Sequence, residues 1–242
     1  EDFYEIKEKN LLREKYKLDV EDERCKERIC FAKSINYGIE SPIGAGYRNR
    51  KPTIGVVSIT KAADFTAPRW REVMQEIKKA GYEEVILDLR HVPGGSSELV
   101  QHGLPYFCNF EPETELVSSP DISRPASIDK QLKFRGKVTV LIDDKTMSNA
   151  ETTASIAQRS GLEVVGTPTA GMWMWGNYGN PQDLGVEGIS ISIPTGPILT
   201  LGSHFGPLGA DEGDFSGQPG VFPNNQELTT VKQLIQRRFP NE

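Results

Sequence analysis

The chain has 242 residues, of which 37% are hydrophobic and 26% are charged, and 34 acidic against 28 basic side chains give a net charge of −6. This length suits one large domain, or a domain with an appendage, that buries about 70% of the surface of the unfolded chain. The weak, evenly spread acidic charge argues against a nucleic-acid partner, no apolar run reaches the roughly 18–20 residues that span a bilayer, and three His and three Cys argue against a metal cage. We therefore expect no nucleic acid, no membrane span, no metal and no cofactor.

The first part of the chain differs in character from the rest. Residues 1–35 are highly charged with a weak apolar stripe, and they predict a helix that packs on the main domain. Residues 41–52 contain Gly and Pro without periodicity and predict a linker or an exposed loop. We therefore divide the chain into a helical N-terminal segment with its linker, residues 1–50, and a main domain, residues 51–242.

Two of the three cysteines, Cys25 and Cys30, lie close together in the charged N-terminal stretch. Their spacing is not a usual zinc spacing, and no His lies nearby. They form either a local disulfide in an exported protein or two free thiols on a helix.

From residue 53 onward, short apolar segments alternate with amphipathic ones. This alternation predicts right-handed βαβ units, and so an α/β domain with a mainly parallel sheet. In the helix predicted over residues 67–81, the apolar face is made by Trp70, Val73, Met74 and Ile77, and Gly81 is the stop signal. Strands are predicted over residues 53–59, 83–90, 137–143 and 162–166. A further helix is predicted to begin at residue 96, and two more are predicted over residues 149–161 and 226–239.

Two segments late in the chain predict an antiparallel hairpin. Residues 189–194 and 197–201 both alternate in polarity, and Thr195-Gly196 separates them. A short turn containing Gly between alternating segments is typical of a hairpin. We expect it at the edge of the sheet.

The first motif that could carry chemistry follows the second predicted strand. Asp88-Leu89-Arg90 ends the strand, and a turn with Pro93-Gly94-Gly95 leads into a helix. Paired glycines at a helix start can turn their amides toward a phosphate, a carboxylate or a developing oxyanion. The alternative is an ordinary Pro-Gly-Gly turn without a ligand.

The second motif is Ser148, at the junction between the third predicted strand and a helix of small residues. The pattern SNAE fits a capping box, in which the hydroxyl accepts from the Glu151 amide. The alternative is a nucleophile at the positive end of a helix, with the amide of Asn149 available to an oxyanion.

These motifs in this order resemble those of a known enzyme family. DLR-x-x-x-GG precedes LID-x-x-T-x-S-N-A-E and VVG-T-P-T-A-G, and the C-terminal GVFPNN resembles the family segment Gly-Val-x-Pro-Asp. Over roughly residues 53–235, the chain resembles the tail-specific (C-terminal processing) serine peptidases of family S41. The SNAE and GTPTAG motifs are closer to those of the tricorn-core branch and of the related retinoid-binding modules. The resemblance implies a crotonase-like α/β fold of ββα repeats, a peptide or protein substrate and an exported location, and it allows an oligomer.

The resemblance also implies roles for the residues of the two motifs. Ser148 occupies the position of the nucleophile, and Gly94 or Gly95, with the Asn149 amide, occupies that of the oxyanion hole. Attack on a peptide carbonyl makes an anion that such preset amide donors stabilise by several kcal/mol.

The chain departs from the family at the general base. Where the Ser-Lys branch has its Lys, this chain has Gly171-Met172-Trp173, and no Lys occurs between Lys145 and Lys232. Lys145 precedes Ser148 in a loop and is expected to be solvated. The tricorn-like branch uses an upstream His, but no His precedes His91.

Histidine supplies the remaining candidates for the base. His91 lies in the Pro-Gly-Gly turn, where the family has Asn, and His204 lies in a Gly-rich loop beside acidic residues. We rank these two nearly equal, whereas His102 falls inside a predicted helix and is expected to be structural. A base must approach the hydroxyl to about 3 Å.

The run Met172-Trp173-Met174-Trp175 is apolar at every position. A strand cannot bury all four side chains on one face, so some are expected to line a pocket beside Ser148 for an apolar side chain or ligand.

Three functional hypotheses remain open at this stage. The first is a serine peptidase, or an acyl-transfer (cyclase-like) enzyme, that works through an acyl-enzyme on Ser148. The second is a degenerate module of the same fold that binds an apolar ligand or peptide. The third is one chain of a processed or oligomeric enzyme whose base comes from another segment.

Overall fold

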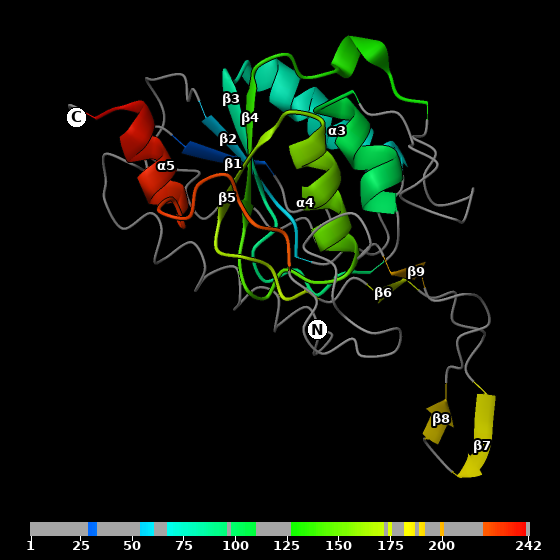
Figure 1. Ribbon diagram of the computed structural model, residues 1–242. Coiled ribbons are helices and arrows are strands. Elements are labelled where there is room, and N and C mark those ends of the chain that lie inside the picture. The colour runs from blue at the N-terminus through cyan, green and yellow to red at the C-terminus, as the bar shows by residue number, and fades with distance from the viewer. Residues whose placement is uncertain are drawn as a thin grey trace.

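A five-stranded parallel sheet forms the centre of the molecule (Figure 1). In the computed structural model the described residues are 29–32, 54–60, 67–95, 98–109, 127–171, 174–175, 182–186, 189–191, 199–200 and 220–240. The strands are β1 (Ile29–Ala32), β2 (Ile54–Ser58), β3 (Glu84–Asp88), β4 (Lys137–Ile142) and β5 (Glu163–Gly166). They lie side by side in the order of the sequence, and each neighbouring pair is parallel. All five carboxyl ends therefore meet at one edge, where open α/β sheets bind ligands.

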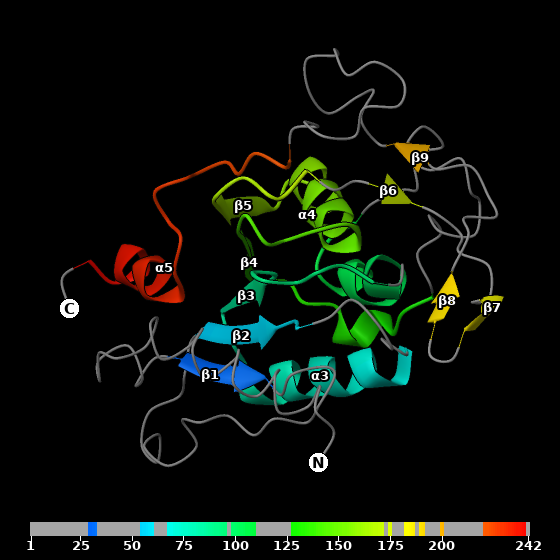
Figure 2. The ribbon, with the colours of Figure 1, turned by 90° about the horizontal axis from the view of Figure 1, so that it is seen from below.

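Helices cover both faces of this sheet. The helices α3 (Ala67–Ala80) and α4 (Asn149–Arg159) lie on one face, and α5 (Val231–Arg238) lies on the other (Figures 1 and 2). Three short helical turns pack on the same face as α3 and α4. They are the π-helix η1 (Leu99–Gly103) and the 3₁₀ turns η2 (Leu104–Tyr106) and η3 (Lys130–Leu132). Every position of β2 and β3 is buried, as expected of parallel strands covered on both sides.

Alternate strand residues supply two separate cores. Val57, Leu87 and Val140 belong to the larger core, with α3, α4 and η1. Ile86 and Leu141 belong to the smaller core, under α5. This alternation fixes the faces: even-numbered residues of β3 lie on the α5 side, so Asp88 belongs to that side.

The predicted helix over residues 67–81 is confirmed, together with its apolar face. Trp70, Val73, Met74 and Ile77 are the buried residues of α3. Trp70 also meets the ring of Phe107 edge to face, with centroids 6.0 Å apart. Gly81 follows the helix at φ 66°, the left-handed conformation that ends helices.

The structure corrects the helix predicted over residues 1–35. Ile29–Ala32 is a strand, and it pairs in parallel with β2 from Ile29–Ile54 to Ala32–Val57. These four residues, ICFA, are apolar after a long charged stretch, and an open edge of β2 gives their backbone hydrogen-bond partners. The remainder of residues 1–50 lies outside the described residues.

The predicted hairpin between residues 189–194 and 197–201 is wrong. Strand β8 (Ile189–Ile191) pairs instead with β7 (Gln182–Val186), and β9 (Leu199–Thr200) pairs with β6 (Met174–Trp175), both antiparallel. Neither pair belongs to the main sheet. Figures 1 and 2 place the β7–β8 hairpin apart from that sheet, and β6–β9 on its α4 side.

No helix among the described residues is long and apolar enough to cross a membrane. Within the same residues, no group of three or more His, Cys, Asp or Glu is arranged to hold a metal ion.

Candidate active site

Two turns meet at the carboxyl edge of the sheet, one after β3 and one after β4. The turn after β3 is fixed to β4 because Leu89 N–H donates to the Leu141 carbonyl at 2.8 Å. Further along, Met147 N–H donates to the Val92 carbonyl at 2.9 Å. These bonds bring the Pro-Gly-Gly turn against the residue before Ser148, so the two motifs of the sequence form one site.

Ser148 stands on a sharp turn between β4 and α4, in a strained backbone conformation. Its φ is 53° and its ψ is −122°. A residue other than glycine rarely adopts such angles, which cost about 1–3 kcal/mol and cluster at functional sites. The nucleophilic serine of some hydrolases stands on the same kind of strained strand-to-helix turn, which exposes the hydroxyl.

The capping box predicted at Ser148 is confirmed. Ser148 N–H donates to Glu151 Oε2 at 2.8 Å, which is the return half of the box. The hydroxyl faces the Glu151 N–H, which is the other half of the box, without a cap hydrogen bond of full geometry. Glu151 N–H also donates to the Ser148 carbonyl at 2.9 Å. The structure therefore bears out the capping interpretation of Ser148, and the role of its hydroxyl as a nucleophile stays a prediction.

Gly94 lies directly against Ser148. A Cβ at position 94 would lie 2.5 Å from Ser148 Cβ and 3.1 Å from Ser148 Oγ, and Gly94 has a φ of 89°. Both the contact and the backbone conformation therefore require glycine. Gly95 follows at φ 139°, so the whole Gly-Gly pair has a backbone that other residues avoid.

Asn149 opens α4 next to Ser148. As the first residue of the helix, it contributes one of the amides that have no partner within the helix and lie at its positive end. Its side chain is 2% exposed, and neither Nδ2 nor Oδ1 makes a hydrogen bond in the described part of the chain.

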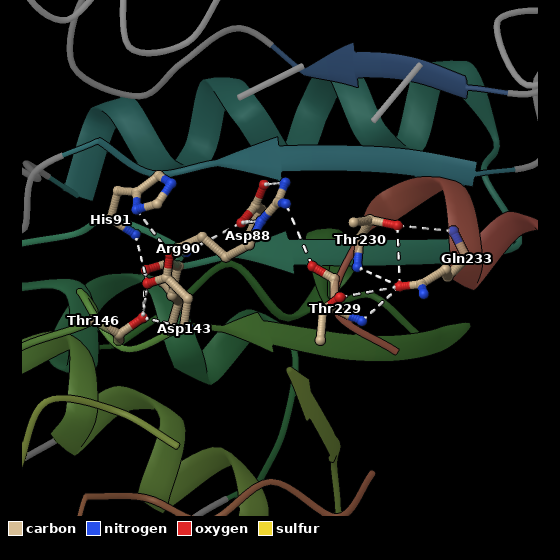
Figure 3. Close-up of polar contacts among 9 residues, drawn as sticks. Asp88, Arg90, His91, Asp143, Thr146, Thr229, Thr230 and Gln233 are labelled. Atoms are coloured by element: carbon tan, nitrogen blue, oxygen red, sulfur yellow. Dashed lines mark hydrogen bonds and ion pairs between the residues drawn. The ribbon is translucent and has the colours of Figure 1, made fainter. Parts of the chain in front are cut away.

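His91 is held tightly by Asp143, the residue that follows β4. His91 N–H donates to Asp143 Oδ1 at 2.9 Å, and His91 Nδ1 lies 2.7 Å from Asp143 Oδ2. His91 also has a positive φ of 62°. Figure 3 shows its ring on the β2 side of Asp143, whereas Thr146 lies on the other side. A base at His91 would have to act on Ser148 through Nε2, and this role stays a prediction.

Sequence reasoning missed Asp143. Besides His91, this carboxylate accepts the Lys145 N–H and the Thr146 hydroxyl, each at 3.1 Å. The Thr146 hydroxyl is also 3.0 Å from the Leu89 carbonyl. Asp143 and Thr146 therefore shape both turns at once. The available signal was an acidic residue at the carboxyl end of a predicted strand, where functional side chains gather.

The Asp88-Leu89-Arg90 motif forms a buried ion pair on the α5 side of the sheet (Figure 3). Arg90 Nε and Nη2 lie 3.0 and 2.9 Å from the two Asp88 oxygens, a bidentate geometry, and Arg90 Nη1 donates to the Thr229 carbonyl at 3.5 Å. The pair fixes the start of the turn that carries His91 and Gly94, and links it to the chain before α5.

The other predicted site residues fall into two groups. His102 is half-buried on η1, and Lys145 is exposed as expected. His204, Met172, Trp173 and Cys25 lie outside the described residues, and so do the side chains of Met174, Trp175 and Cys30. The backbone of Met174–Trp175 is β6.

The family assignment rests on a match that covers more than half of the chain. A model of peptidase family S41 matches residues 53–201. The chain belongs to this family. The match includes both turns of the candidate site, Gly94 and Ser148 among them. The tricorn-like branch within the family stays a prediction. No curated protein matches the sequence.

Several peptidases and a lipoprotein are among the solved structures to which this chain is similar. A lipoprotein from Streptococcus agalactiae is 14% identical, with a TM-score of 0.51, and the match covers 81% of this chain and 69% of that one. The photosystem II D1 C-terminal processing protease is 20% identical, with a TM-score of 0.45 and coverage of 72% and 42%. The tricorn protease is 18% identical, with a TM-score of 0.42 and coverage of 73% and 15%. The S41 chain thus spans less than half the length of the D1 processing protease, and at these identities the likeness concerns the fold alone.

Proposed function

We propose that this S41 chain cleaves peptide bonds through an acyl-enzyme on Ser148. The observation that carries the proposal is the strained turn at Ser148, with φ 53° and ψ −122°, at the positive end of α4. An ordinary N-cap residue has an extended backbone, so capping α4 does not require this strained conformation. Presentation of a nucleophile at the positive end of α4 accounts for it.

The proposed reaction is a two-step acyl transfer. Ser148 Oγ attacks the peptide carbonyl carbon while a base takes the hydroxyl proton, and the carbonyl oxygen becomes an oxyanion. When the C–N bond breaks, the base returns the proton to the leaving amine, and the acyl group remains as an ester on Ser148. Water then attacks the ester with the help of the same base, which releases the acid and restores the hydroxyl.

Backbone amides are proposed to hold the oxyanion. The Asn149 N–H opens α4, and Gly94 lies within van der Waals contact of Ser148. In the proposed reaction, the amides of Gly94 or Gly95 and of Asn149 donate to the oxygen bonded to the carbon that Ser148 attacks. The absence of a side chain at position 94 lets this turn lie directly against Ser148.

The base is proposed to be His91 or His204. His91 has an orienting carboxylate, because Asp143 Oδ2 lies 2.7 Å from its Nδ1, and this favours Nε2 as the nitrogen that would accept the proton. His204 is the second candidate because it lies beside acidic residues in a Gly-rich segment of the sequence. His91→Ala and His204→Ala separate the two: the variant that loses cleavage identifies the base, and wild-type cleavage by both rejects both assignments.

The substrate is proposed to present an apolar side chain to the run Met172–Trp175. Strand β6 lies on the same side of the sheet as α4 in both views (Figures 1 and 2). Helix α4 begins directly after Ser148. Met and Trp side chains make adaptable apolar walls.

A peptide library tests the proposed activity. The protein is incubated with peptides from a digested proteome, and the cleavage products are read by mass spectrometry. We expect new termini that share an apolar residue beside the cleaved bond and that vanish with Ser148→Ala. Cleavage by Ser148→Ala at the wild-type rate would contradict the proposal, and peptide binding without cleavage would favour the degenerate binding module.

A further inference from the structure

Glu151, in the first turn of α4, is completely buried. Its Oε2 accepts the Ser148 N–H at 2.8 Å. Its Oε1 accepts two further hydrogen bonds, from the Thr169 hydroxyl at 2.6 Å and from the Gly171 N–H at 2.7 Å. One carboxylate therefore joins the turn that carries Ser148 to the loop that follows β5.

The loop after β5 is in turn fixed by the segment that precedes α5. Val221 N–H donates to Thr169 Oγ1 at 2.7 Å, and Thr169 N–H donates to the Val221 carbonyl at 3.2 Å. Gly220 approaches so closely that a Cβ there would lie 2.2 Å from the Thr169 carbonyl oxygen. Because a hydroxyl can accept one bond and donate another, Thr169 passes the constraint from Val221 to Glu151.

Ser148 needs a constraint of this kind. A non-glycine residue keeps a sparsely populated backbone conformation only where its surroundings over-determine it. Glu151 supplies one such restraint through the Ser148 N–H, and the contact with Gly94 supplies another. The hydrogen bonds to a charged, buried acceptor are the strong ones.

We infer that Glu151 is a positioning residue for Ser148. Its carboxylate holds the turn in the conformation that presents the hydroxyl, and through Thr169 it makes that conformation depend on the segment before α5. The same carboxylate accepts the N–H of Gly171, the residue before the Met172–Trp175 run. Glu151 therefore holds both the proposed nucleophile and the residue that precedes the proposed substrate-binding run. The inference rests on the proposed role of Ser148 as nucleophile.

The first test measures how fast a fluorophosphonate labels Ser148. Glu151→Gln replaces one acceptor oxygen with a donor, so at least one of the bonds to Ser148, Thr169 and Gly171 is lost. We expect the labelling rate constant to fall about 10- to 100-fold, the equivalent of one hydrogen bond to a charged group. Thr169→Val should also slow labelling, whereas Thr169→Ser keeps the hydroxyl and should restore it.

The second test does not depend on activity. Hydrogen exchange of the Ser148 and Gly171 amides, followed by NMR, should be faster in Glu151→Gln and in Thr169→Val, but not in Thr169→Ser. The Thr169 pair decides the question if Glu151→Gln does not fold.

The two readouts separate this inference from the proposed function. If the wild type is not labelled at all, the proposed function fails, and the exchange rates alone decide whether Glu151 holds the turn. Unchanged exchange of the Ser148 amide overturns the inference, whatever the labelling. Labelling of both variants at the wild-type rate overturns it as well.

Discussion

At the scale of single residues, the candidate site depends on the space between Gly94 and Ser148. A Cβ at position 94 would lie 2.5 Å from Ser148 Cβ, a distance at which one of the two turns must shift. Neither turn can shift freely, because Met147 N–H is bonded to the Val92 carbonyl. A substitution here therefore acts on the nucleophile directly.

Gly94→Ala should abolish most of the reactivity of Ser148. We expect the fluorophosphonate labelling rate to fall about 100-fold, because a displacement of about 1 Å is enough for such a loss. Gly161→Ala is the matched control: Gly161 has a similar φ of 85°, but a Cβ there meets nothing within 4 Å. Both variants should lose about 1–2 kcal/mol of stability to the positive φ, and only Gly94→Ala should lose labelling. Equal labelling of the two variants would refute the contact argument.

Asn149→Leu should leave the free energy of unfolding unchanged or raise it. The carboxamide is 2% exposed, and in the described part of the chain its two polar atoms make no hydrogen bond. A buried polar group without a partner costs about 1–3 kcal/mol, and an apolar side chain of similar size removes that cost. Urea unfolding measures the difference, and a loss above about 1 kcal/mol would show that the carboxamide has a partner.

The resemblance to family S41 predicted that Gly94 and Ser148 lie in one site, and the structure brings these two residues together. The sequence did not predict the Asp143–His91 pair, because the two residues are far apart in the chain and meet only where β3 and β4 end side by side. It also did not predict the bonds of Glu151 to Thr169 and Gly171. A capping box already accounts for a Glu at position 151 through one carboxylate oxygen, so the local sequence gives no reason to expect distant partners for the other oxygen.

At the scale of elements, periodicity identified the parts that bury a regular face. The buried residues of α3 are the four that the 3.6-residue period selects, and β2 to β5 are the apolar runs of the sequence. The two failures, at β1 and in the proposed hairpin, concern very short strands. In such strands the pairing partner, rather than the local pattern, decides the structure.

The apolar face of α3 makes a direct prediction at this scale. Met74 is fully buried against the larger core, whereas the neighbouring Gln75 is exposed. Met74→Ala should therefore lower the free energy of unfolding by about 2–5 kcal/mol, and Gln75→Ala should change it by less than about 0.5 kcal/mol. Denaturant unfolding of both variants checks this, and a small effect of Met74→Ala would mean that α3 does not anchor the core.

At the scale of the whole molecule, α5 closes the second face of the sheet and is fastened at both of its ends. At its start, the Thr229 carbonyl accepts from Arg90 of the site turn. At its far end, Arg237 donates to Glu163 of β5, with Nη2 and Oε2 2.8 Å apart. The chain segment around α5 thus connects the carboxyl end of β3 with the amino end of β5.

The Glu163–Arg237 contact makes stability depend on pH. The hydrogen bond from Arg237 lowers the pKa of Glu163, against the effect of burial, and the charges of Arg237 and Lys137 act in the same direction as the bond. A carboxyl with a lowered pKa stabilises the fold above its unfolded pKa of about 4.3, and the contribution disappears as the pH falls through the folded pKa. Glu163→Gln should therefore be less stable than wild type at neutral pH.

The difference between Glu163→Gln and wild type should shrink as the pH falls from about 4.3 toward the lowered folded pKa of Glu163, below which both side chains are neutral. Urea unfolding of the two proteins across this pH range measures it. A difference that stays constant with pH would show that the ionised pair does not contribute.

The most direct test of the central claim locates the fluorophosphonate adduct on the folded protein. After labelling, the protein is digested and the modified residue is read by tandem mass spectrometry. The strained turn, the contact with Gly94 and the start of α4 predict a single adduct on Ser148 that is lost when the protein is unfolded before labelling. No adduct on the folded chain, or an adduct on a different serine, would contradict the assignment of Ser148 as the nucleophile.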